Sequence, residues 1–188
     1  MTDRHPGRPL SAELTERVKT AAAEVLAEHG ERALNADMLS SMLGCGKAGI
    51  YRRWPSISYL VADVITDAVH VPYPDLTGAI ADDLASLIPS WAAPPNQSER
   101  AAAAVVSMAG ADPVIAAAVE QSLLAPLQDG VQAVAAASRA QGQTITTVQV
   151  ASWQALLQAL WWQRLSPHPL SWERPHLIAL LRGVVNAA

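Results

Sequence analysis

Apolar positions along this chain repeat at the spacing of helices rather than of strands. Between residues 11 and 29 they recur at i, i+4, i+7 and i+8, which predicts an amphipathic helix that Gly30 ends. Comparable stripes follow along most of the chain, separated by proline, glycine and capping residues. Nine such segments can be distinguished, so the pattern predicts an all-α protein of about nine helices.

Two short helices are predicted close together in the N-terminal part. The first spans 36–43, with Asn35 as its N-cap and Gly44 at its end. The second spans about 47–53, after a three-residue turn. Two short helices joined in this way, behind a longer first helix, form a helix-turn-helix, whose second helix enters the major groove of DNA.

The proline-containing segment 71–75 is a rigid connector and the best domain boundary. Five more helices are predicted beyond it. An apolar stripe from Leu76 to Trp91 marks the first, and Ser98 and Ser171 are the expected caps of the second and the fifth.

The third helix of this C-terminal part is expected to be the longest. Asp112 supplies its N-cap and Pro113 its first turn, and the helix reaches about residue 139 with a kink at Pro126. The fourth spans about 147–164.

Composition supports the helical prediction and excludes several classes of protein. The chain has 188 residues, of which 36 are alanine, 51% are hydrophobic and one is cysteine. Alanine favours helix, the apolar fraction excludes a disordered chain, and one cysteine excludes a disulfide scaffold. The longest charge-free run, 140–163, contains six glutamines, so no membrane span is expected and we expect a soluble cytoplasmic protein.

The net charge of −4 would speak against a nucleic-acid partner, but it is unevenly distributed. Between Asp37 and Asp63 the chain carries Lys47, Arg52 and Arg53 and no acidic residue. This basic island is either a surface for DNA or a chance gap on a solvated face.

The run Gly44-Cys-Gly-Lys-Ala-Gly-Ile-Tyr-Arg-Arg-Trp-Pro-Ser56 resembles the recognition motif of the TetR family of bacterial transcriptional repressors. Similar members of that family read close to G-V-G-K-A-T-I-Y-R-R-W-P-S-K. The resemblance implies an N-terminal three-helix helix-turn-helix DNA-binding domain and a C-terminal helical ligand-binding and dimerisation domain. It implies a homodimer that binds double-stranded palindromic operator DNA and represses transcription until a small-molecule effector releases it.

The resemblance also implies a division of the chain into successive parts. These are a flexible arm (1–10), the DNA-binding domain (11–56) with its helix-turn-helix (35–54), a connecting helix (57–71) and the C-terminal domain (72–188). The arm carries two arginines, which either reach a minor groove or belong to a terminus that touches nothing.

The DNA-binding candidates are small, polar and cationic residues of the motif. They are Asn35, Gly46, Lys47, Ala48, Gly49, Tyr51, Arg52, Arg53 and Trp54. By motif position, Lys47 and Tyr51 match residues that contact the DNA backbone, whereas Trp54 is also expected to anchor the helix inward.

Three residues of the motif depart from the family pattern. Ile57 replaces a lysine that touches phosphate, Gly49 replaces a threonine, and Cys45 replaces a valine. Cys45 is read as a small apolar filler, with a redox switch as the alternative. These departures motivate a second hypothesis, a helical small-molecule-binding protein of the same fold with weakened DNA binding.

Aromatic and alanine-rich positions supply the other candidates. Pocket candidates for an aromatic or lipophilic effector are Trp91, Trp153, Leu157 and Trp161, for which plain core packing is the alternative. Dimer-interface candidates are Ala151, Ala155, Ala159, Trp162, Leu177, Leu181 and Val184, for which burial within one large domain is the alternative. The sequence contains no catalytic set, cofactor motif or metal-ligand spacing, so we expect a non-enzyme without cofactor or metal.

Overall fold

The computed structural model describes residues 12–89, 91–166 and 168–186, and the regular structure in these ranges is helical apart from one isolated β-bridge. In chain order the elements are α1 (Ala12–His29), η1 (Glu31–Ala33), α2 (Ala36–Leu43), α3 (Lys47–Tyr51), α4 (Ile57–Ala68), α5 (Ile80–Ser86), α6 (Gln97–Val105), η2 (Val106–Gly110), α7 (Pro113–Val119), η3 (Glu120–Leu124), α8 (Ala125–Ala140), α9 (Thr147–Arg164) and α10 (Arg174–Asn186). Because α7, η3 and α8 form one continuous run, the described chain has nine helical rods, as the sequence predicts. None of the described helices is both long and apolar enough to span a membrane.

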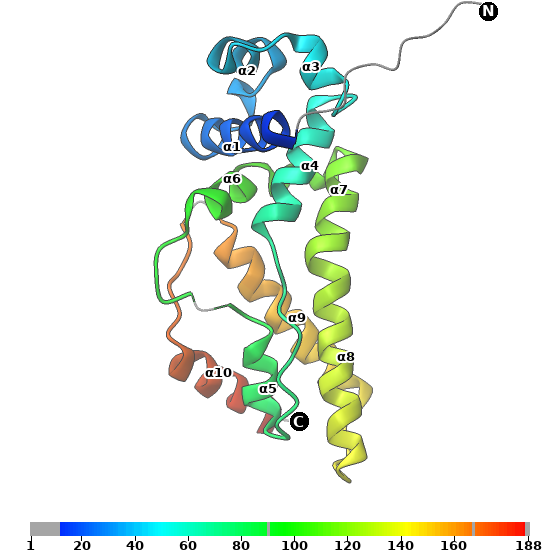
Figure 1. Cartoon of the computed structure of the whole chain (residues 1–188). Helices are drawn as coiled ribbons and strands as arrows, with labels where there is room; N and C mark the ends of the chain where they lie inside the picture. Colours follow the sequence, from blue (N-terminus) through cyan, green and yellow to red (C-terminus); the bar gives the residue numbers. More distant parts are fainter. Residues whose placement is uncertain (1–11, 90, 167, 187–188) are drawn as a thin grey trace, which may run out of the picture.

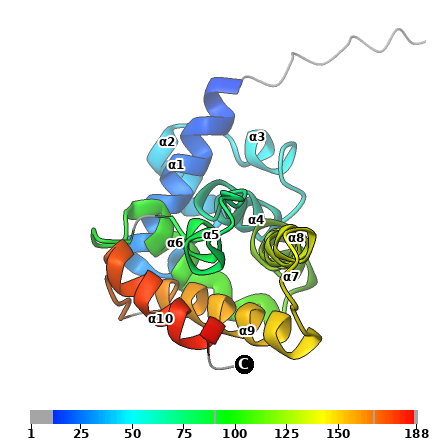
Figure 2. The same ribbon diagram turned by 90° about the horizontal axis from the view of Figure 1, so that it is seen from below.

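The helices divide into a head and a body (Figure 1). The head consists of α1–α3 and the loop that follows, residues 12–56, and the body of α4–α10, residues 57–186. Helix α4 descends from the head into the body beside the long α7–α8 rod, and α5 and α10 lie at the far end. Seen from below, α9 and α10 line one side of the body and the α7–α8 rod another (Figure 2).

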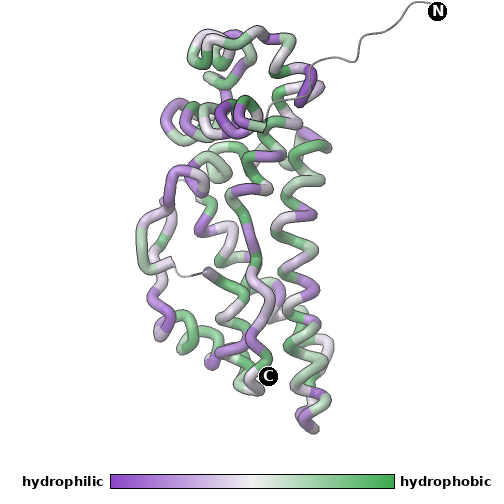
Figure 3. The backbone as a smooth tube through the Cα atoms, in the orientation of Figure 1, coloured by the Kyte–Doolittle hydropathy of each residue, from purple (hydrophilic) through white to green (hydrophobic). Residues whose placement is uncertain are grey.

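Head and body share one continuous core rather than being separated by a flexible linker, and hydrophobic residues, green in Figure 3, recur along the helices of both parts. Helix α1 packs on α6, and α4 packs against α1, α6 and α7. One side-chain pair reinforces the contact between head and body: Lys19 Nζ of α1 lies 2.7 Å from Asp67 of α4. Within the body, the Ser58 hydroxyl of α4 donates to Asp112, the N-cap of α7, at 2.6 Å. The hydrogen bond from Ser58 lowers the pKa of Asp112, and the one to Asp67 raises the pKa of Lys19.

The long rod begins and bends as its sequence indicates. Asp112 accepts hydrogen bonds from the first turn of α7, and Pro113 occupies that turn. The disturbance expected at Pro126 takes the form of the π-helical turn η3, which ends directly before α8. Proline lacks an N–H, and a π-helical turn is one way for a helix to accommodate a break in its hydrogen-bond ladder.

Several element boundaries in the body differ from the sequence prediction. Helix α4 ends at Ala68 rather than at 71, and α5 begins at Ile80 rather than at Leu76. Helix α5 ends at Ser86, and Trp91 lies beyond it, in an antiparallel bridge in which the Trp172 backbone N–H donates to Trp91 O at 3.0 Å. Helix α10 begins at Arg174 rather than after the expected cap Ser171. The bridge joins the loop after α5 to the loop before α10. Residues expected at the end of α5 and at the start of α10 therefore lie in these loops.

Glu99 joins a helix cap to a buried ion pair. Asn96, and not the expected Ser98, caps α6 in a reciprocal capping box with Glu99. The Glu99 carboxylate also accepts two hydrogen bonds at 2.8 Å from the guanidinium of Arg164, whose side chain is 3% exposed. That guanidinium lies 5.7 Å from the centroid of the Trp91 ring. These contacts connect the start of α6 to the end of α9.

Candidate nucleic-acid interface

Helix α2 and the turn that joins it to α3 are stabilised by the two capping residues predicted from the sequence, Asn35 and Gly44. The Asn35 side chain caps α2 by accepting a hydrogen bond from Met38 N at 2.9 Å. Its amide also donates to Ala33 O. Gly44 adopts a left-handed conformation with φ of 60°, which a residue with a Cβ adopts at a cost, and its N–H donates to Ser40 O. The N-terminal limit, the C-terminal limit and both caps of α2 agree with the prediction.

Helix α3 is shorter than predicted, ending at Tyr51 rather than at Arg53. A tight turn follows, in which the backbone N–H groups of Arg53 and Trp54 both donate to Ile50 O. Arg52 and Arg53 therefore lie on a helical turn beyond α3, and they face different surroundings.

The inward side of α3 holds it against α1 and α4. Ile50 is 1% exposed and Trp54 is 4% exposed, and the indole N–H of Trp54 donates to Asp63 of α4 at 2.7 Å. Gly49 is buried as well, and a Cβ at this position would lie 3.8 Å from Leu14 of α1. Two of the DNA-binding candidates, Gly49 and Trp54, are thus placed on the protein-facing side.

Arg53 also acts within the protein. Its Nε donates to the Thr15 hydroxyl at 2.8 Å, and its Nη1 donates to Gly49 O at 2.8 Å. These bonds fasten the end of α3 to α1, so this half-buried arginine orients the recognition helix. Nothing in the sequence distinguishes Arg53 from its neighbour Arg52 for this supporting role.

The outward side of the motif exposes the remaining candidates. Lys47, Ala48, Tyr51 and Arg52 are all exposed, with Tyr51 at 48%, and Gly46 precedes them at the N-cap of α3. This face combines one small residue, one aromatic hydroxyl and two cations. Such a surface can approach a DNA groove closely at its centre and meet phosphates at its edge.

Lys47 is held by a partner that sequence reasoning missed. Its ammonium forms an ion pair with Asp37, which lies in the first turn of α2. The hydrogen bond to Asp37 raises the pKa of Lys47 above its ordinary value. Both side chains are exposed, so the pair stays accessible to a competing phosphate. Asp37 was visible in the sequence as the acid that borders the basic island.

Two departures from the family motif contribute to packing. Ile57 opens α4 and packs against the core, and Cys45 is half-buried against the same core. The filler role expected for Cys45 fits this position. The arm over 1–10 lies outside the described residues.

A solved structure from Rhodococcus sp., assigned to the TetR family of transcriptional regulators, superposes with a TM-score of 0.57 at 12% sequence identity, covering 94% of this chain and 98% of that one. The chain has the fold of a TetR-family regulator. This TetR-like fold agrees with the fold implied by the motif.

The relatives matched by sequence cover only part of the chain. Three curated proteins, from Mycobacterium bovis and two strains of Mycobacterium tuberculosis, carry the name of uncharacterized HTH-type transcriptional regulators. Each is 34% identical to this chain over 87 residues, which covers 46% of this chain and 41% of the relative. The chain therefore spans less than half the length of the curated relatives it matches. No protein-family model matches the chain.

The candidate pocket residues are packed in the body. Trp91, Trp153, Leu157 and Trp161 are each 3% exposed or less, and the Trp91 and Trp161 rings meet edge to face at 4.9 Å. The indole N–H groups of these three tryptophans find no acceptor among the described residues. A role in ligand binding stays a prediction for them.

The dimer candidates fall into two groups. Ala151, Ala155 and Ala159 lie exposed along α9, as the close-approach hypothesis requires. Leu177 and Leu181 are buried within the body, so they are not available to a second subunit. The other two, Trp162 and Val184, are half-buried.

Proposed function

We propose that this chain is a sequence-specific DNA-binding regulator of transcription. The observation that carries the proposal is the outward face of the helix-turn-helix, where Lys47, Ala48, Tyr51 and Arg52 are exposed on a turn fixed by Asn35. Helix α3 enters the major groove, the small side chain of Ala48 allows close approach, and the tyrosine and the two cations meet the backbone. The TetR-like fold and the regulators matched in sequence support this assignment.

The domain arrangement follows from the same proposal. Residues 11–56 bind DNA, 57–71 connect, and 72–188 dimerise and bind an effector. The exposed alanine face of α9, with Val148 at 71% exposure beside its start, supports a homodimer built on this helix. In the dimer two recognition helices about 34–36 Å apart would match a palindromic operator.

Regulation by a small molecule completes the proposal. The protein represses transcription, and an effector bound in the body favours an arrangement of heads with a different spacing. Because α1 packs directly on α6, a change in the body reaches the head without a flexible intermediate.

A salt-dependent gel shift tests the proposal. The wild-type dimer is expected to bind the DNA upstream of its own gene more tightly than random duplex, with an affinity that falls as salt rises. Arg52→Gln should weaken binding, whereas Arg182→Gln, the same change on α10, should not. Equal affinity for the upstream DNA and for random duplex at moderate salt would contradict the proposal.

A second candidate function is a ligand-binding protein of this fold with weakened DNA binding. Two observations favour it: Lys47 is engaged by Asp37, and a partly buried Ile57 packs against the core where a phosphate-binding lysine is usual in the family. Under this hypothesis Ile57→Lys should create DNA binding that the wild-type chain lacks. Strong binding by the wild type rejects it.

A further inference from the structure

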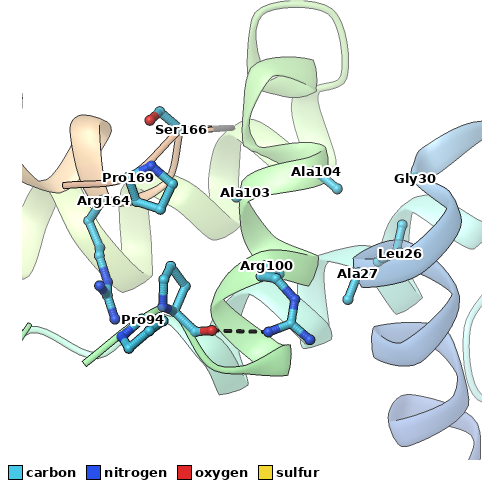
Figure 4. A pocket seen from close by; sticks show the side chains of 11 residues that line it. Leu26, Ala27, Gly30, Pro94, Arg100, Ala103, Ala104, Arg164, Ser166 and Pro169 are labelled. Atoms are coloured by element: carbon cyan, nitrogen blue, oxygen red, sulfur yellow. Dashed lines mark hydrogen bonds between the residues drawn. The ribbon is translucent and has the colours of Figure 1, made fainter. Parts of the chain in front are cut away.

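A cavity of about 500 Å³ opens where the head meets the body. One wall is formed by Leu26 and Ala27 near the end of α1, and another by Ala103 and Ala104 of α6 (Figure 4). Pro94 closes it from the loop before α6. Its volume falls within the range of about 300–1,000 Å³ that small-molecule sites occupy.

The lining combines an apolar surface with an available cation. Leucine, alanine and proline form most of it, and none of its lining residues is an aspartate or a glutamate. Arg100 of α6 lies at the cavity with an exposed guanidinium, which donates to Pro95 O from Nη1 at 3.0 Å (Figure 4). Since guanidinium carries five N–H donors, this single bond leaves a fork for an anion.

Arg164 lines the cavity too, but its charge is already compensated. Both carboxylate oxygens of Glu99 accept from it, and it donates a third bond to Ala93 O. The net charge that a ligand meets therefore comes from Arg100. A planar guanidinium prefers a carboxylate, which it can bind through two parallel hydrogen bonds.

We propose that this cavity binds a small amphipathic monocarboxylate. The carboxylate pairs with the Arg100 guanidinium, and the apolar part of the ligand lies between the alanines of α6 and the end of α1. A neutral ligand of the same shape would leave the guanidinium unpaired, and a cation would meet it at like charge. The site is distinct from the tryptophans proposed above for the effector, none of which lines this cavity.

Because the cavity is lined by α1, a ligand bound there can influence the helix-turn-helix. The wall residues Leu26 and Ala27 belong to α1, and the same helix holds α3 through Thr15, which accepts from Arg53. A ligand that touches α1 and α6 together has a different affinity for each arrangement of these helices, and so biases the head. This coupling, unlike the binding itself, rests on the proposed function.

Binding is tested without DNA by titration calorimetry. The probes are octanoate, 4-phenylbutyrate and 1-naphthaleneacetate, each paired with its uncharged amide. At least one acid should bind at least tenfold more tightly than its amide, and Arg100→Gln should remove that difference. Arg182→Gln is the matched control on α10 and should leave it unchanged, while Ala104→Phe should fill the cavity and abolish binding of the acid. Absence of binding by all three acids, or equal binding of acid and amide, overturns the proposal.

Coupling is tested by reciprocity. The acid that binds should change the dissociation constant for the upstream DNA, and the DNA should change the dissociation constant for the acid by the same factor. A factor of one in both directions overturns the coupling while the calorimetry still decides the site. If the chain binds no specific DNA, the proposed function fails, and the acid-against-amide comparison remains an independent result.

Discussion

The head and the body both engage an arginine in internal contacts, but the head places an exposed arginine directly beside it in the chain. In the body, Arg164 is 3% exposed and its guanidinium bonds to Glu99 and to a backbone carbonyl. In the head, Arg53 is used in a similar way, but its neighbour Arg52 is exposed. In the body a carboxylate compensates the charge of the buried arginine, whereas the head combines a supporting arginine with an exposed one directly adjacent to it in the chain.

The space around two buried glycines also differs between the two regions. Gly130 lies in α8 where a Cβ would come within 2.4 Å of Leu87, so the body has no room for one. Gly49 lies in α3 where a Cβ would meet Leu14 at an ordinary 3.8 Å. The side chains around Gly130 leave no room for a methyl group, whereas those around Gly49 do, although both glycines are buried. Substitutions in the head and in the body should therefore separate residues that stabilise the fold from residues that contact DNA.

The largest effect is expected from the buried ion pair. Glu99→Gln keeps a residue suited to the capping box but leaves the guanidinium of Arg164 buried without its counter-charge, which should cost about 3–5 kcal/mol of unfolding free energy. Asp82→Asn, which breaks the exposed pair with Arg182, should cost at most about 1 kcal/mol. Urea unfolding measures both. Equal losses in the two variants would show that burial does not distinguish these pairs.

The adjacent arginines of the head come next. Arg53→Gln removes the bonds to Thr15 and to Gly49 O, and should lower the unfolding free energy by about 1–3 kcal/mol. Arg52→Gln should leave stability unchanged and reduce the slope of log affinity against log salt by about one unit. Urea unfolding and gel shifts at several salt concentrations test the pair. A loss of stability in Arg52→Gln that matches Arg53→Gln would contradict the division of roles.

Local chemistry explains which parts of this structure were predictable from sequence. The cap Asn35, the left-handed Gly44 and the Asp112-Pro113 start each act within a few residues, so their signals lie in the sequence itself. The run Thr147–Arg164 was likewise delimited correctly.

Tertiary contacts explain what the sequence did not reveal. Which arginine of the pair 52–53 turns inward depends on Thr15, which lies 38 positions before Arg53. The sequence favoured a dimer interface for Leu177 and Leu181, and only the packing of α10 against α5 and α9 places them inside the body. The cavity beside Arg100 needs segments from α1, α6 and the end of α9, which no local pattern brings together.

The two helical glycines give a smaller and opposite pair of effects. Gly130→Ala should destabilise the protein by about 1–3 kcal/mol, because the new methyl group overlaps a side chain that is itself fully buried. Gly49→Ala should stabilise it by about 0.5–1 kcal/mol, because alanine restricts the unfolded chain and fits the space. Thermal and urea unfolding measure the sign of each change. Destabilisation by Gly49→Ala would show that the head is packed as tightly as the body.

The smallest expected effect concerns the exposed pair of the head. Because Asp37 raises the pKa of Lys47 above an already alkaline value, Lys47 stays charged throughout the neutral range and loses its charge only when the pH rises beyond that range. Changing the pH near neutrality therefore cannot release Lys47, but Asp37→Asn can. That variant frees the ammonium for a phosphate and removes a negative charge beside the DNA, so affinity should rise on the order of threefold at low salt and the gain should shrink as salt screens it.

Asp129→Asn is the matched control for that variant, since it makes the same change at an exposed position of α8, away from the head. It alters the net charge of the chain equally, so it isolates the contribution of position. A threefold gain in both variants would assign the effect to net charge alone, and no gain in Asp37→Asn would show that Lys47 already meets phosphate while paired. A gain confined to Asp37→Asn would mean that the exposed pair of the head, unlike the buried pair of Arg164 and Glu99 in the body, holds its cation loosely enough for DNA to compete for it.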